Sequence, residues 1–150
     1  MSFKPIRTFL EDKLLALDND FEVYDRPFSD DEIGANNYDK RYHISYGPVQ
    51  STTANQNVTQ DVVTATVDLY FEGKRDETEL LDNAMDFANR YRLYCLRPEF
   101  LIGLNNIKRV VCNNINPQSL PTNDSALKIQ LQFSISMIFG TGITLDNEEP

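Results

Sequence analysis

The side chains that could do chemistry in this chain are few, and they do not form a catalytic set. The only histidine is His43, and alternation along its segment places it with Arg41 and Ser45 on one face of a strand. A catalytic histidine needs a nucleophile and an orienting carboxylate, and no glycine-bracketed serine or activated cysteine accompanies it. We therefore expect a half-exposed sheet histidine and no enzymatic activity.

Metal and cofactor chemistry is equally weakly supported. The acidic run Asp30, Asp31 and Glu32 could attract a hard divalent cation, but no EF-hand spacing follows it. A solvated loop, or docking to a basic partner surface, is favoured over metal binding. Cys95 and Cys112 lack a second pair of ligands at zinc spacing, so they are expected to be reduced thiols. The six glycines are scattered singly, so there is no phosphate-binding loop, and no cofactor or metal is expected.

Aromatic and basic side chains alternate near the end of the second predicted helix, at Arg90, Tyr91, Arg92, Tyr94 and Arg97. Such a pattern can stack on single-stranded nucleic acid. Tyr91, however, falls on the apolar stripe of that helix, and the arginines complement the helix dipole. For Arg92, Tyr94 and Arg97 a subunit interface is the better functional interpretation, because tyrosine and arginine are enriched at interfaces.

The composition limits the class of protein. The formal net charge is -9, from 23 acidic and 14 basic side chains, which argues against sequence-specific nucleic-acid binding and against adhesion to anionic membranes. It is compatible with a surface past which DNA slides without binding. No apolar run is long enough to span a membrane, and no secretory signal is evident. We expect one domain over 1–139, followed by a flexible acidic tail over 140–150.

Two alternating segments, 61–72 and 126–139, are unusually long for a chain of this size. At about 3.4 Å per residue the second spans roughly 48 Å, whereas a compact chain of this length has a diameter of roughly 38 Å. Such a strand must either bend sharply or project from the body. We expect it to project and to meet a partner.

The remaining patterns supply the elements around these strands. Amphipathic helices are predicted over 5–17 and from Asp76 to just before Pro98, and shorter strands over 21–24, 41–46 and 107–112. The strand 41–46 is expected to end at Gly47 and Pro48, and 113–125 to be a loop. The uncharged segment 48–60 is either a mobile loop or the tip of a hairpin. The order predicts an α+β fold with a mostly antiparallel or mixed sheet, two helices packed on one face, an extended β-hairpin, and a polar opposite face open to solvent or to another chain.

Over roughly residues 5–139 the chain resembles the tail terminator (tail completion) proteins of long-tailed bacteriophages. The resemblance rests on the N-terminal amphipathic helix and short strand, on the alternating segment 61–72 followed directly by the helix from Asp76, and on two final strands ending in the run 129–136. It implies a hexameric ring on the end of the tail tube, which stops tube polymerisation and offers a surface to the head-side connector. It also implies a virion protein assembled in the bacterial host cytoplasm, with DNA passing through the lumen.

Two alternatives stay open. The first is another neck or tail structural protein, such as a head-closure or tube-like protein, and the second is a small α+β ligand-binding or regulatory domain, or an enzyme with an unrecognised site. For an assembly role the candidate interface residues are the acidic run, the middle of the uncharged segment and the helix end: Asp30, Asp31, Glu32, Gln56, Asn57, Arg92, Tyr94 and Arg97.

Overall fold

The computed structural model describes residues 3–23, 40–55, 58–72, 77–97, 107–120 and 123–140, and the structural statements below concern these residues. They form two helices and five strands. In chain order these are α1 (Lys4–Leu17), β1 (Glu22–Val23), β2 (Lys40–Asn55), β3 (Val58–Glu72), α3 (Glu77–Cys95), β4 (Ile107–Leu120) and β5 (Asn123–Gly140).

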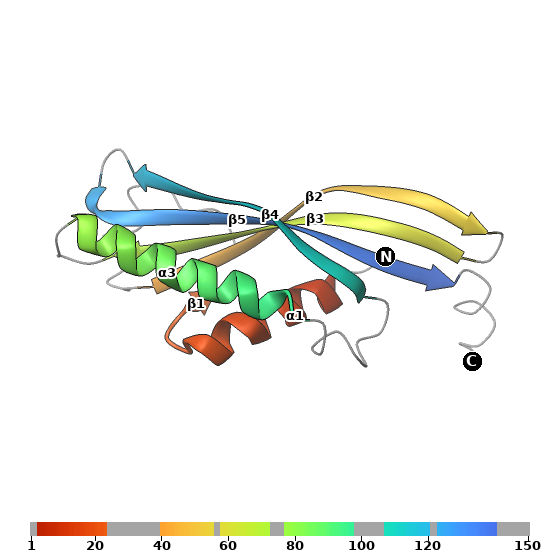
Figure 1. The fold of residues 1–150 in the computed structure, drawn as a ribbon, viewed down its shortest axis with the longest axis horizontal. Helices are drawn as coiled ribbons and strands as arrows, with labels where there is room; N and C mark the ends of the chain where they lie inside the picture. The colour runs from red at the N-terminus through yellow and green to blue at the C-terminus, as the bar shows by residue number, and fades with distance from the viewer. Residues whose placement is uncertain are drawn as a thin grey trace.

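The five strands form one sheet in the order β1-β2-β3-β5-β4. The pair β1–β2 is parallel, and the three other pairs are antiparallel. Figure 1 shows α1 and α3 on the same side of this strongly twisted sheet. The predicted α+β fold, with a mixed sheet, two helices on one face and an extended hairpin, is therefore confirmed.

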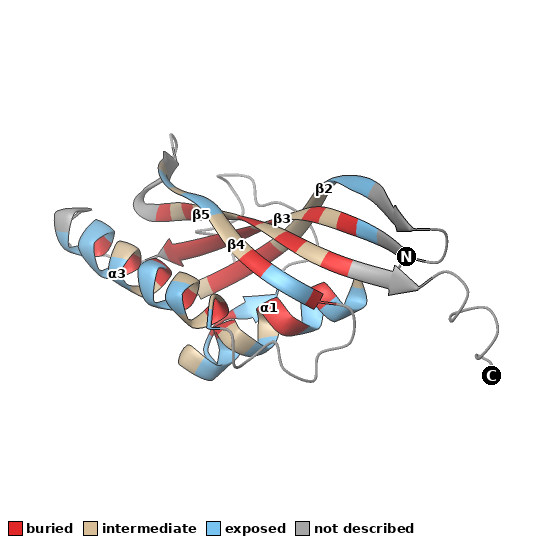
Figure 2. Ribbon diagram, turned by 45° about the vertical axis from the view of Figure 1, so that its right-hand side comes forward, coloured by how far each residue is buried: buried red, intermediate tan, exposed pale blue. Residues whose placement is uncertain are grey.

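The core lies between the helices and the apolar face of the sheet, where alternation in β3 and β5 produces one continuous surface. Figure 2 shows buried residues recurring at every second position of β5. The antiparallel register between β3 and β5 runs without a shift from Val58 opposite Gly140 to Glu72 opposite Ala126. The buried apolar side chains of β5 are Leu127, Ile129, Leu131, Phe133, Ile135 and Met137.

The helices bury the stripes that the sequence predicts. On α1 the buried residues are Ile6, Phe9, Leu10 and Leu14, and on α3 they are Leu80, Ala84, Ala88, Tyr91 and Cys95. The two helices are joined by the hydroxyl of Tyr91, which donates a hydrogen bond of 2.8 Å to the carbonyl oxygen of Leu10. The ring of Tyr91 also meets Phe133 of β5 edge to face, with centroids 6.1 Å apart, so this one side chain connects both helices to the sheet.

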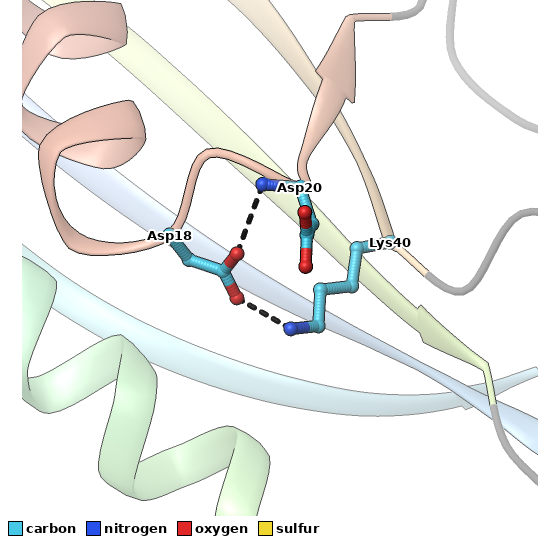
Figure 3. Close-up of polar contacts among 3 residues, drawn as sticks. All are labelled: Asp18, Asp20 and Lys40. Atoms are coloured by element: carbon cyan, nitrogen blue, oxygen red, sulfur yellow. Dashed lines mark hydrogen bonds and ion pairs between the residues drawn. The ribbon is translucent and has the colours of Figure 1, made fainter.

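Asp18 ends α1 and fixes the turn that leads into the sheet (Figure 3). Its carboxylate accepts a hydrogen bond of 2.9 Å from the backbone N–H of Asp20 and forms an ion pair with Lys40 at the start of β2. Partial burial alone would raise the pKa of Asp18, but the hydrogen bonds from Lys40 and Asp20 and the charge of Lys40 bring it below its usual value.

Two predicted strand ends are wrong. In both cases the strand continues through a proline that was expected to lie at a strand end or in a loop. The strand β2 does not end at Gly47 and Pro48 but continues to Asn55, because a register shift between Tyr46 and Val49 accommodates the two residues. Such a bulge leaves its extra residues outside the ladder, so the N–H that proline lacks is not needed there. The strand segments 49–55 and 58–60 thus form the distal part of a hairpin.

The predicted loop over 113–125 is largely strand. The strand β4 runs on to Leu120, with Pro117 opposite Ile129, and β5 already begins at Asn123. Because β4 lies at the edge of the sheet, the side of the Pro117 backbone that lacks an N–H can point outward, away from β5. The acidic tail was predicted over 140–150, but Gly140 is the last residue of β5 and pairs with Val58. Residues 141–150 lie outside the described residues, so the rest of the division into a domain and a tail stays a prediction.

Candidate assembly surfaces

Three strands run past the helices at one end of the sheet and form what we call the arm, comprising residues 49–55 of β2, 58–60 of β3 and 138–140 of β5 (Figure 1). They are paired through Thr52 opposite Gln60 and Gln60 opposite Ile138. None of the arm residues is charged. At the start of the arm Val49 and Gln50 are exposed, so uncharged surface faces solvent there.

The two outer edges of the sheet differ in how well they resist pairing with another strand. The edge strand β4 carries the exposed side chains of Lys108 and Arg109, contains Pro117, and has three register shifts against β5. Charges, prolines and bulges are devices by which proteins protect sheet edges. On this evidence β4 is a protected edge.

The opposite edge is protected over only a short length. The strand β1 pairs with Arg41 and Tyr42 alone, and among the described residues no strand pairs with the outer side of β2 beyond them. From Val49 to Thr53 this edge is uncharged and pairs regularly with β3 on its inner side. The arm segment of β2 is therefore the edge better able to accept an added strand.

Polar side chains form cross-strand contacts on the sheet face opposite the helices. The amide of Gln130 on β5 donates to the carboxylate of Asp68 on β3 at 3.2 Å. From β4, Asn113 donates to the hydroxyl of Ser134 at 2.7 Å, and Asn114 donates to the side-chain oxygen of Gln132 at 3.2 Å. These bonds connect β3, β5 and β4, so the central part of this face is a hydrogen-bonded polar surface.

One region of the polar face is buried, which corrects the prediction that His43 is half-exposed. His43 is only 9% exposed, and Arg41, Asp68 and Tyr70 are buried with it. In the register Arg41 lies opposite Tyr70, and His43 lies opposite Asp68. Large cross-strand neighbours cover one another, and this does not follow from alternation along one strand. The expectation that the whole face is open is therefore wrong at this end.

The structure separates the three predicted interface residues that lie on α3 and just after it. Tyr94 contacts two cations, with the Nζ atom of Lys13 5.4 Å and the guanidinium carbon of Arg97 5.6 Å from its ring centroid. These are cation–π distances. Arg97 is exposed at the surface. Sequence reasoning missed Lys13, because its contact joins two helices that are far apart in the chain.

Arg92 belongs to a different surface of α3. It is half-buried and donates a hydrogen bond to the side-chain oxygen of Asn89. Burial raises the pKa of the Cys112 thiol on β4, and the charge of Arg92 partly offsets that effect. The other predicted interface residues, Asp30, Asp31, Glu32, Gln56 and Asn57, lie outside the described residues.

Both cysteines are free. Burial raises the pKa of Cys95 to about 12, so its thiol stays protonated near neutral pH. Within the part of the chain that the structure describes, no group of three His, Cys, Asp or Glu side chains could hold a metal ion. No helix in that part is long and apolar enough to cross a membrane.

Comparison with known proteins concerns the fold. No family model matches the sequence, and no curated protein matches it. Among solved structures, the chain is similar to a chain in a structure described as the virion of a native gene transfer agent (GTA) particle. The TM-score is 0.52 at 9% sequence identity, and the match covers 87% of this chain and 92% of that chain. The similarity therefore extends over nearly the whole length of both chains.

Proposed function

We propose that this chain is a structural protein of a phage-like virion, and specifically a tail terminator that assembles as a hexameric ring on the end of the tail tube. In this role the ring stops polymerisation of the tube and offers its other face to the head-side connector, and it has no catalytic activity. The ring forms in the bacterial host cytoplasm and stays in the tail of the finished particle.

The observation that carries this proposal is the uncharged arm, whose β2 edge pairs with no strand among the described residues. An exposed strand edge without charges tends to pair with another chain unless it is covered. The opposite edge is protected by Lys108, Arg109 and Pro117, so the open edge is not a general property of this sheet. A sheet with one protected edge, and with no described strand on the arm segment of its other edge, is suited to a defined assembly in which the arm contacts a neighbouring chain.

Two further observations support an assembly role in a virion. The chain of the GTA particle has a similar fold over 92% of its length, which is consistent with a phage-like structural role for this fold. The net charge of -9 allows a ring whose channel repels DNA, so that a genome passes through without specific binding. A contact between different surfaces of successive subunits closes into a ring when its rotation permits.

The first experiment measures the assembly state and its dependence on the arm. We expect hexameric rings by native mass spectrometry and negative-stain electron microscopy, either of the free protein or after addition of tube subunits. The variant Gln50→Lys/Gln60→Lys adds two charges to exposed arm positions and is expected to weaken ring formation at least about tenfold, because each contact must then bury two charges that have no partner. The matched control Asn19→Lys/Asn116→Lys adds the same charge at exposed positions outside the arm and is expected to form rings normally.

The second experiment separates a terminator from another neck or tail protein. Purified tube subunits are polymerised with and without this protein, and tube lengths are measured by electron microscopy. A terminator shortens the length distribution in proportion to its concentration, whereas a head-closure protein leaves it unchanged. A protein that stays monomeric with and without tube subunits would refute the proposal.

A further inference from the structure

We infer that residues 141–149 of one copy add as a strand to the arm of the next copy, along the outer side of β2, and so connect the subunits of the ring. This inference rests on the proposed ring and names the segment that fills the contact between its subunits. The added strand is expected to run antiparallel to β2, from the tip of the arm towards the body.

The arm has two outer sides, and a ring needs both of them. In the arm β3 lies between β2 and β5, because Gln60 pairs with Thr52 on one side and with Ile138 on the other. Among the described residues no strand pairs with the outer side of β2 over Val49–Thr53, or with the outer side of β5 beyond Met137. Opposite sides of one arm can therefore face two different neighbours, which is the head-to-tail arrangement that closes into a ring.

The chain leaves the described sheet at the tip of the arm. Gly140 is the last residue of β5 and lies opposite Val58, so the residues that follow it start at the tip, on the β5 side. To reach the outer side of its own β2, the chain would have to cross three strand spacings, about 14 Å, which takes roughly four extended residues. The β2 strand of a neighbour on the β5 side needs no such crossing.

The sequence of the segment matches the edge that it would cover. Residues 141–149 lie outside the described residues, and they comprise five uncharged residues, 141–145, followed by 146–149 with three acids. The edge Val49–Thr53 likewise comprises five uncharged residues. On a neighbouring copy the two uncharged stretches can pair with each other. If the segment crossed its own arm, the acids would instead lie along the uncharged edge, so the sequence favours a second copy as the acceptor.

Beyond the arm, the same strand comes close to a cation. Tyr46, just before the bulge of β2, stacks on Phe3 with ring centroids 4.3 Å apart. Arg7 is exposed and lies one helical turn after Phe3, to whose carbonyl oxygen it donates its backbone N–H. Burial raises the pKa of Tyr46, and the charge of Arg7 partly offsets that effect, which is consistent with a guanidinium group near this part of β2. Once the uncharged stretches have paired, the acids of 146–149 lie towards Arg7, and opposite charges favour the contact.

The test exchanges the charges of the two contacting parts. Arg7→Glu places an acid near the acidic residues of the segment, and Glu148→Lys/Glu149→Lys places bases near Arg7. Each variant alone is expected to raise the midpoint concentration of ring formation by at least about tenfold at low ionic strength, because every contact then joins like charges. Mixed in equal amounts, the two variants are expected to form rings again, with the two kinds of subunit alternating. Native mass spectrometry identifies such rings by their three-to-three composition.

The mixture shows whether the segment binds another copy. A chain that carries all three substitutions is expected to form rings whether the segment binds its own arm or that of a neighbour, but mixing restores assembly only in the second case. Arg90→Glu and Asp82→Lys/Asp86→Lys make the same changes in charge at exposed positions on α3, away from the arm, and are expected to form rings normally. Circular dichroism and thermal melting verify that each variant folds.

A second pair of variants tests the pairing of the backbones. Ile143→Pro/Thr144→Pro removes two successive backbone N–H groups, one of which points towards β2 in any register. Ile143→Ala/Thr144→Ala keeps both groups and is the matched control. The proline variant is expected to weaken ring formation at least about tenfold more than the alanine variant, because each contact loses ladder hydrogen bonds.

The outcomes separate this inference from the proposed function. Rings of normal stability from each charge variant alone, mixtures that stay unassembled, or equal effects of the proline and alanine variants would each overturn the inference and leave the proposed ring intact. If the unmodified protein forms no ring under any condition, the proposed function itself fails.

Discussion

Replacing Tyr91 with phenylalanine tests how the two helices are joined, and the expected effect changes with pH. The substitution keeps the ring against Phe133 and removes only the hydroxyl that donates to Leu10. Loss of one buried neutral hydrogen bond lowers the free energy of unfolding by about 1 kcal/mol. At pH 7 we therefore expect Tyr91→Phe to be less stable than the unmodified protein by about that amount.

The difference should disappear at alkaline pH. Burial, followed by the nearby Cys95 thiol, raises the pKa of Tyr91 well above its usual value of 10.0. In the unfolded chain Tyr91 ionises near pH 10, whereas in the folded chain it stays protonated, so its contribution is present below pH 10 and is lost as the pH rises further. The loss is about 1.4 kcal/mol for each pH unit above 10. Phenylalanine does not ionise, so the two proteins should reach equal stability at about pH 11.

Urea unfolding followed by circular dichroism, at one protein concentration and at several pH values from 7 to 11, measures both effects. The other tyrosines are common to the two proteins, so the difference between their stabilities isolates Tyr91. Tyr94→Phe is the control, because it removes a hydroxyl from a half-buried ring and leaves the hydrogen bond between Tyr91 and Leu10 in place. A gap between Tyr91→Phe and the unmodified protein that stays constant from pH 7 to 11 would refute the assignment of Tyr91 as a buried, protonated link.

Three further predictions concern other parts of the molecule. Asp18→Asn should lower the free energy of unfolding at pH 7 by less than about 1 kcal/mol, because the ion pair with Lys40 is partly exposed. The variant should also be less sensitive to acid: the lowered pKa of Asp18 stabilises the fold above its unfolded pKa near 4, and the unmodified protein loses that stabilisation as the pH falls. Urea unfolding at pH 7 and pH 3 measures both effects. A thiol reagent at pH 8 should label Cys112 in the folded protein well before Cys95, and mass spectrometry of peptides would detect the reverse order. Phe133→Ala should cost about 3–5 kcal/mol, because it empties a fully buried site, and a smaller loss in urea unfolding would mean that the core around it collapses.

The fold follows closely from local patterns in the sequence, and it departs from them at two prolines. The period of two in 61–72 and 126–139, and the apolar stripes of the helices, are properties of neighbouring residues, so the elements could be predicted directly. The course of the strands at Pro48 and Pro117 could not be predicted in this way. A proline ends a strand in the middle of a sheet, but a bulge or an edge strand can accommodate it. Whether a strand lies at the edge depends on the order of the whole sheet.

The candidate surfaces were less accessible to sequence reasoning, since they depend on contacts between distant residues. Tyr94 and Arg97 were identified from composition and do lie together, but Lys13, which completes their cluster, comes from the other helix. Arg92 has the same local signal as Arg97, yet it is half-buried and its charge acts on the Cys112 thiol of β4. The burial of His43 likewise depends on neighbours on β3.

The uninterrupted register between β3 and β5 has a mechanical consequence. The fifteen pairs from Val58 opposite Gly140 to Glu72 opposite Ala126 run from the tip of the arm to the far end of the body. If β3 is pulled along its length at the tip while β5 is held at the other end, the force loads all these pairs in shear, and they must break together rather than one after another. In the ring that we propose, such a joint would carry tension from the arm directly into the interior of each subunit.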